Sequence, residues 1–148
     1  MKKTFLWVYI SFILLIFAGS MAYAQGPVPA LPDYSKWHLV VSGPYSTVLN
    51  GKQVNINVGI YNNTDSVNLI RHTMVLVYNE QNSLWLALLS EEIGERQPDG
   101  SINTKEDRYY LFENQNSNWV LGKSFQSGPN TGQEIRDFLK AKYDLEFK

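Results

Sequence analysis

The sequence has no cysteine among its 148 residues, and this absence removes several kinds of site at once. Disulfides, thiolate metal sites and cysteine nucleophiles all need a thiol group. Attachment of lipid to an exported protein also uses a cysteine, at the first residue after the signal peptide. We therefore expect a product that no attached lipid holds at a membrane.

The sequence also lacks the common catalytic and nucleotide-binding motifs. It contains no G-x-S-x-G elbow, no G-x-G-x-x-G string and no P-loop. Its two histidines, His38 and His72, have a spacing that fits no zinc motif. These absences favour a protein that is not an enzyme, and they predict no metal and no other cofactor. The least favoured alternative is a small hydrolase that uses His72 with Glu91 or Glu92.

A run of basic residues is missing as well. The chain has 13 lysines and arginines against 14 aspartates and glutamates, for a formal net charge of -1, and the basic residues are scattered. Nucleic-acid binding needs a basic stripe that neutralises phosphates. The sequence therefore excludes nucleic acid as a partner.

The first 24 residues have the three parts of a secretory signal peptide. Lys2 and Lys3 form a basic start, residues 5–18 form an apolar run, and Ala22-Tyr23-Ala24 supplies a small-residue exit. The apolar run is shorter than the ~20 residues that span a bilayer, which argues against an uncleaved membrane anchor. We expect cleavage between Ala24 and Gln25 and a periplasmic or secreted product without a membrane anchor.

Residues 25–33 are expected to form a proline-rich leader. Pro27, Pro29 and Pro32 cannot donate backbone hydrogen bonds to a sheet, so this segment should be extended. Residues 34–148 should then form a single α+β domain, which is long enough to bury a core without covalent staples.

The middle of the chain predicts β-strands joined by short turns. Asn50-Gly51 tolerates the positive φ angles of a two-residue hairpin. Residues 52–61 alternate apolar and polar, which is typical of a strand with one wet face. Residues 94–104 are expected to form a loop. The six expected strands lie at the following residues: from about 37 to 49, 52–61, 67–78, 84–93, 108–112 and 119–125.

Two of the central strands are apolar on both sides. Residues 74–78 and 84–89 show no alternation, so both faces of the sheet should be covered there. Either the sheet curls into a partial barrel or a second copy of the chain covers the other face in a homodimer.

A C-terminal helix is expected to begin at Thr131. Thr131-Gly132-Gln133-Glu134 has the form of a capping box, in which the Thr hydroxyl and the Glu carboxylate satisfy first-turn donors. Ile135, Phe138 and Leu139 then make an apolar stripe that should pack on the sheet.

The expected fold is therefore α+β, a curled six-stranded antiparallel β-meander (a partial barrel) with one C-terminal helix. This arrangement resembles the calycin-like carriers of apolar ligands at the level of fold alone. Ser35-Lys36-Trp37 stands where lipocalins have Gly-x-Trp.

Aromatic residues are abundant, at 14% of the chain, and concave ligand sites prefer aromatic walls with few polar groups. We expect an exported non-catalytic binding module that holds an apolar or aromatic small molecule, or a peptide, inside the curl. The alternative is an envelope-associated structural or protein-interaction factor, such as an inhibitor. The candidate ligand-binding residues are Arg71, His72, Tyr78, Trp85 and Trp119.

Overall fold

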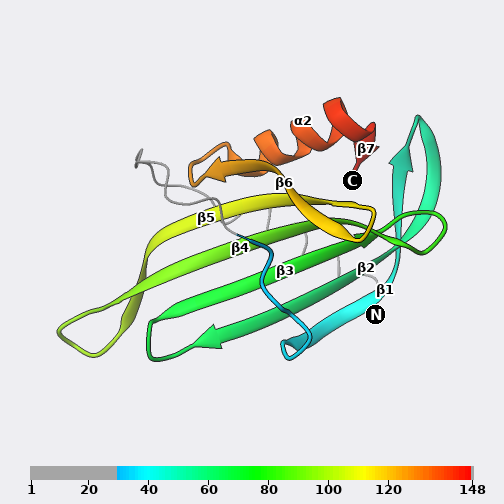
Figure 1. Cartoon of the computed structure of the whole chain (residues 1–148). Coiled ribbons are helices and arrows are strands. Elements are labelled where there is room, and N and C mark those ends of the chain that lie inside the picture. Colours follow the sequence, from blue (N-terminus) through cyan, green and yellow to red (C-terminus); the bar gives the residue numbers. More distant parts are fainter. Residues whose placement is uncertain (1–29, 148) are drawn as a thin grey trace.

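The computed structural model describes residues 30–147. The signal peptide expected at residues 1–24 and most of the expected leader lie outside the described residues. Within the described part, seven antiparallel strands and one helix follow one another along the chain (Figure 1). The elements are β1 (His38–Leu49), β2 (Lys52–Asp65), β3 (Ile70–Tyr78), β4 (Leu84–Arg96), β5 (Ile102–Gln115), β6 (Asn118–Gln126), α2 (Thr131–Tyr143) and β7 (Leu145–Glu146).

The strand order is that of a meander with one addition. From edge to edge the order is β6-β5-β4-β3-β2-β1-β7, and the sheet curls into a half-barrel. The α+β class, the curl and the C-terminal helix are therefore confirmed, while the expected number of strands was one too few. Figure 1 shows the far end of the β1–β2 hairpin turned up beside β7 and α2. The helix contacts both edge strands of the sheet, β6 and β7.

The additional strand, β7, forms because the chain reverses at the end of the helix. Asp144 adopts a left-handed conformation with φ 49°, and its N–H donates to the carbonyls of the last helical turn. Leu145 is then buried and pairs with Leu49, while the Thr47 hydroxyl donates to the carbonyl of Glu146. A strand of two residues carries no periodicity that the sequence could display.

Two connections test the turn predictions. Asn50 and Gly51 have φ angles of 51° and 72° between the paired residues Leu49 and Lys52, so this hairpin is confirmed. The expected loop at residues 94–104 is wrong, because β4 and β5 continue pairing to Arg96 and Ile102. Most residues of these outer pairs are polar and exposed, so the pairs lack the alternating apolar signal on which the strand prediction depended.

The inner face of the sheet carries the larger core. Val54, Ile56, Val58 and Ile60 of β2 all point to this face, as their alternation predicts. They pack with residues of the other strands and of the helix. The fully buried members with the largest side chains include Tyr109, Leu86, Leu111, Ile135 and Leu145.

The outer face carries a second apolar cluster, which confirms that the central strands are apolar on both sides. Its buried members are Met74 and Leu76 of β3, Ala87 and Leu89 of β4, and Phe112 of β5. A segment that precedes β1, residues 30–37, lies across this face, and we call it the strap. Figure 1 shows the strap running across β3 and β2 before the chain enters β1.

The helix is confirmed, but its expected cap is wrong. The N-cap is Asn130, which makes no side-chain capping bond, and the Thr131 hydroxyl donates instead toward the carbonyls of Gln126 and Gly128. Thr131 is itself inside the helix and buried, so its hydroxyl ties the helix to the end of β6. Ile135 and Leu139 are buried against the inner face as expected. Among residues 30–147, no helix is long and apolar enough to cross a bilayer.

Candidate functional site

Six half-buried aromatic residues gather on the outer face of the sheet. We call this set the outer aromatic face: Tyr34, Trp37, Tyr61, Tyr78, Tyr110 and Trp119. Tyr34 and Trp37 belong to the strap, and the others come from β2, β3, β5 and β6. They surround the buried outer cluster, so the face combines a rigid apolar floor with polar phenol and indole groups at its surface.

The strap packs on this face through three side chains. Leu31, Tyr34 and Trp37, each three residues from the next, pack on the outer cluster, while Ser35 and Lys36 between them are exposed. A turn fixes the spacing, because the Ser35 N–H donates to Asp33 Oδ1 and the Trp37 N–H donates to the Tyr34 carbonyl, both at 3.0 Å.

Three tyrosines meet where the strap crosses β2 and β3. The rings of Tyr34 and Tyr61 have centroids 5.5 Å apart. Burial raises the pKa of the Tyr34 phenol above its ordinary value, and the neighbouring phenols of Tyr78 and Tyr61 raise it further. The Tyr34 phenol therefore remains a neutral hydrogen-bond donor and acceptor throughout the physiological pH range.

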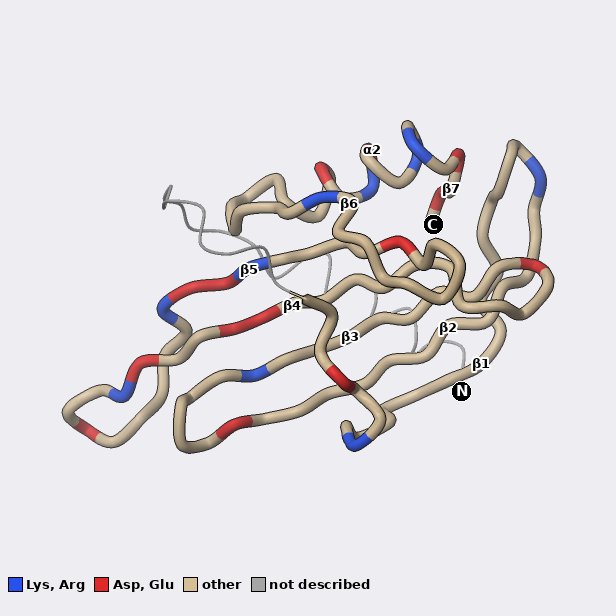
Figure 2. Tube along the Cα trace, viewed as in Figure 1, with Lys and Arg blue, Asp and Glu red and all other residues tan. Residues whose placement is uncertain are grey.

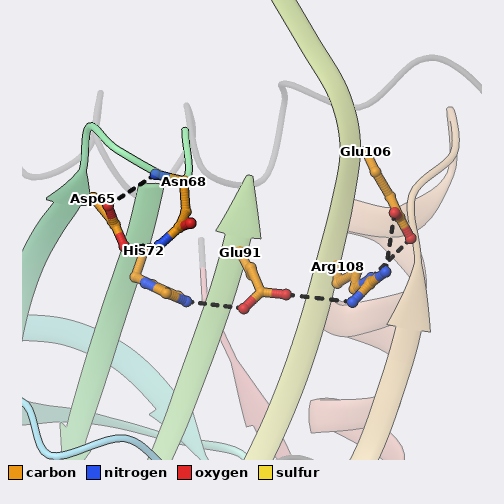
Figure 3. Close-up of polar contacts among 6 residues, drawn as sticks. All are labelled: Asp65, Asn68, His72, Glu91, Glu106 and Arg108. Carbon is orange, nitrogen blue, oxygen red and sulfur yellow. Dashed lines mark hydrogen bonds and ion pairs between the residues drawn. The ribbon is translucent and has the colours of Figure 1, made fainter. Parts of the chain in front are cut away.

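A row of charged side chains crosses the outer face at the end of the strands that carries the β2–β3 turn (Figure 3). His72 Nε2 lies 2.9 Å from Glu91 Oε2, and Glu91 Oε1 lies 3.6 Å from Arg108 Nη1. Arg108 also donates to both oxygens of Glu106. His72, Glu91 and Arg108 are cross-strand neighbours on one face, so the row follows directly from the register of β3, β4 and β5.

The Asp65 carboxylate stands at the β2 side of this row. It accepts hydrogen bonds from the backbone of Val67 and from the backbone and side chain of Asn68. These bonds, those from Asn68 above all, hold the pKa of Asp65 below its ordinary value. The carboxylate thereby closes the β2–β3 turn next to His72.

A second charged row lies on the inner face at the same end of the strands. Arg71 donates to Glu92, and Glu92 pairs across the sheet with Asp107. Burial raises the pKa of the Asp107 carboxyl to about 6, and the negative charge of Glu92 adds to the rise, while Arg71 opposes it. Asp107 Oδ1 is buried and accepts no hydrogen bond within residues 30–147. Figure 2 shows acidic and basic residues gathered at the same end of β3, β4 and β5.

The structure does not bring all five candidate residues together. His72, Tyr78 and Trp119 lie on the outer face, whereas Arg71 and Trp85 lie on the inner face. Arg71 and His72 must separate because successive strand residues point to opposite sides. Trp85 sits at a register irregularity between β3 and β4 and packs edge-on against Tyr143 of the helix, with ring centroids 5.6 Å apart. A single lining inside the curl, as the sequence predicts, is therefore not formed.

Sequence reasoning missed two residues of the outer face. Trp37 stacks on His72, with ring centroids 5.4 Å apart and the ring planes inclined by 25°. Asn114 pairs with Trp119 across β5 and β6, and its Oδ1 is buried without a hydrogen-bond partner among the described residues. The period of two along β5, which places Tyr110, Phe112 and Asn114 on one face, could have identified Asn114.

Within residues 30–147, no group of three or more His, Asp or Glu side chains is arranged to hold a metal ion. Comparison of the chain with protein-family models, with curated proteins and with solved structures gives no match.

Proposed function

We propose that this chain is an exported, non-catalytic binding module, and that it holds an apolar or aromatic group of a small molecule or peptide on its outer aromatic face. We assign the binding site to the outer face of the sheet. The sequence predicts it on the inside of the curl, which is the opposite face. The inner face is occupied by its own core, in which Tyr109, Phe125 and Ile135 are almost completely buried.

One observation carries the proposal. Within residues 30–147, the strap packs on the outer cluster through Leu31, Tyr34 and Trp37, and the aromatic residues of β5 and β6, Tyr110 and Trp119, are half-buried. The accessible parts of these two rings, next to the buried outer cluster, give a ligand a contact area at a low cost in conformational entropy.

Aromatic small-molecule binding tests this function. The side-chain indole resonance of Trp119 is followed by NMR while p-cresol is added to the full chain as its host processes it. We expect a saturable shift. In Trp119→Phe, where the ring resonances of Tyr110 are followed instead, we expect binding of p-cresol to be about tenfold weaker if the indole supplies about 1.4 kcal/mol of contact energy. Val120→Ala is the matched control, because Val120 is the next residue on β6 and points to the opposite face. An indole resonance that does not respond to p-cresol contradicts the proposal.

The alternative, an envelope-associated interaction factor, uses the same face for a protein partner. Native mass spectrometry of the protein recovered from its own cells separates the two. A small added mass supports a ligand carrier, and a co-purifying protein or second subunit supports an interaction factor.

His72 and Glu91 are within hydrogen-bond distance, which is the geometry that a hydrolase would need. The indole of Trp37 covers one face of the imidazole ring. We therefore assign the pair to fastening the strap.

A further inference from the structure

The strap is held on the outer face by side chains alone. Two hydrogen bonds shape it, from the Ser35 N–H to Asp33 Oδ1 and from the Trp37 N–H to the Tyr34 carbonyl, and both stay within the strap. Among the described residues, no hydrogen bond joins the strap to a strand of the sheet. Separation of the strap from the sheet therefore breaks apolar and aromatic contacts but no hydrogen bond.

The surface beneath the strap is apolar and completely covered. Met74 and Leu76 of β3 and Ala87 of β4 are each 0% exposed. Leu31 and Tyr34 of the strap pack on the outer cluster to which these residues belong. Contact of this surface with water would cost free energy in proportion to the apolar area exposed. The strap is therefore favoured on the sheet until another apolar group takes its place.

Tyr34 shows which chemical group this position accepts. The centroids of its ring and of the Tyr61 ring are 5.5 Å apart, with the planes inclined by 51°. Tyr61 pairs with Met74 across β2 and β3, so the Tyr34 ring lies next to the buried outer cluster. Burial, and then the phenols of Tyr78 and Tyr61, raise the pKa of the Tyr34 phenol. The position therefore favours an aromatic ring with a neutral polar group over an anionic one.

The end of the strap next to β1 is held at a separate place. The Trp37 indole stacks on the His72 imidazole, with ring centroids 5.4 Å apart, and His72 Nε2 lies 2.9 Å from the Glu91 carboxylate. Trp37 also directly precedes the first residue of β1. The first part of the strap, residues 31–34, can therefore leave the sheet while Trp37 stays in place.

We propose that Tyr34 occupies a binding position for an uncharged, phenol-like ring, and that residues 31–34 leave the sheet when a ligand ring takes this position. The strap is then a lid that competes with the ligand for the same surface. This inference rests on the proposed function. It adds a second position on the outer aromatic face, the chemical class of the ring that binds there, and its regulation by the strap. Such competition lowers the apparent affinity by the fraction of molecules in which the strap is closed.

The p-cresol titration of the full chain, as its host processes it, also tests this inference when the methyl resonances of Leu31 are followed beside the Trp119 indole. p-Cresol has the ring and hydroxyl of a tyrosine side chain, so it matches the group that it must displace. We expect the Leu31 methyl resonances to move saturably toward the positions of a leucine in an unfolded chain. p-Toluate, which carries a carboxylate in place of the hydroxyl, should bind about tenfold more weakly.

Two variants weaken the strap as a competitor. Tyr34→Ala removes the resident ring and should tighten p-cresol binding about tenfold. Asp33→Ala removes the acceptor of the Ser35 N–H, and it leaves no vacancy on the sheet because Asp33 is exposed. It should tighten binding about twofold. Lys36→Ala, at an exposed position of the same turn, is the matched control and should leave binding unchanged. Unchanged or weaker binding in Tyr34→Ala and Asp33→Ala would overturn the competition.

The outcomes separate this inference from the function on which it rests. If p-cresol shifts the Trp119 resonance but not those of Leu31, the lid is wrong and the binding function stands. If p-cresol shifts the Leu31 resonances alone, the lid stands and the binding position at Trp119 is wrong. If it shifts neither, both are wrong. If p-toluate displaces Leu31 as well as p-cresol does, the assignment to uncharged rings is overturned.

Discussion

The indole of Trp37 stacks on the imidazole of His72, and His72 contacts the Glu91 carboxylate through Nε2 at 2.9 Å. The strap is thereby fastened to β3 and β4 at the point where the chain turns into β1. The outer aromatic face and the outer charged row meet at this pair. A change at either residue should therefore affect how the strap lies on the sheet.

Trp37→Ala should loosen the strap and lower the free energy of unfolding by about 2 kcal/mol, less than for a fully buried aromatic residue. Amide hydrogen exchange should rise in residues 30–37 and at His72, with little change on the inner face. Lys36→Ala is the control, because Lys36 is exposed in the same turn. Unchanged exchange in the strap of Trp37→Ala would show that the stacking contributes nothing to its position.

Asp107→Asn should stabilise the protein at pH 7.5 and have little effect at pH 4. The folded-state pKa of Asp107, about 6, lies above its ordinary value of 3.8, so the folded state binds the proton more tightly than the unfolded state does. Stability is therefore lost as the pH rises from about 4 through 6, and a neutral amide avoids that loss. After discounting for solvent screening, the gain at pH 7.5 is about 1 kcal/mol, or about 2–4 °C in Tm.

Thermal unfolding of the two proteins between pH 4 and pH 8 checks this sign. Glu95→Gln, an exposed carboxylate farther along β4, is the control and should shift Tm by less than a degree or so at every pH. A destabilised Asp107→Asn at pH 7.5 would mean that the charged carboxylate is favourable in the folded state.

Gly94→Ala should destabilise the far end of the β4–β5 hairpin by about 2 kcal/mol. A Cβ atom at this position would lie 2.8 Å from Ile102 Cγ2 and 3.1 Å from the Leu69 carbonyl oxygen, which accepts the Gly94 N–H. Gly122→Ala is a matched control, because its Cβ would meet nothing closer than 3.4 Å. Denaturant unfolding of both variants gives the comparison, and equal effects would contradict the steric account.

The protein recovered from its own cells should begin at Gln25. Ala24→Leu should block this cleavage, because signal peptidases accept small side chains next to the cleaved bond. Intact mass measurement distinguishes the two forms. A wild-type protein that retains Met1 and sediments with lipid would remove the basis for an exported module.

The sequence predicted the parts of the fold whose signal lies within one element. The alternation of Val54, Ile56, Val58 and Ile60, the Asn50-Gly51 turn and the stripe of Ile135 and Leu139 all correspond to observed structure. The central strands were correctly expected to be covered on both sides. The helix and the curl of the sheet cover the inner face, and the strap covers part of the outer face. Nothing in the sequence of the strap indicates that it lies there.

The candidate site was less predictable, because it depends on which face each residue occupies. Trp85 and Trp119 look equivalent in the sequence, since each follows a polar turn at the start of a strand. A register irregularity at the start of β4 leaves Trp85 on the inner face, while Trp119 lies on the outer one. Such irregularities arise from pairing between strands and are not encoded in the local pattern.

The order in which the chain is synthesised gives the strap one more property. Residues 30–37 leave the ribosome before any strand of the sheet on which they pack. Leu31, Tyr34 and Trp37 therefore have no docking surface until β3 and β4 have paired, so this contact closes late in folding. Until then the strap is accessible to chaperones and proteases. Once the strap resists proteolysis, the sheet on which it packs has formed.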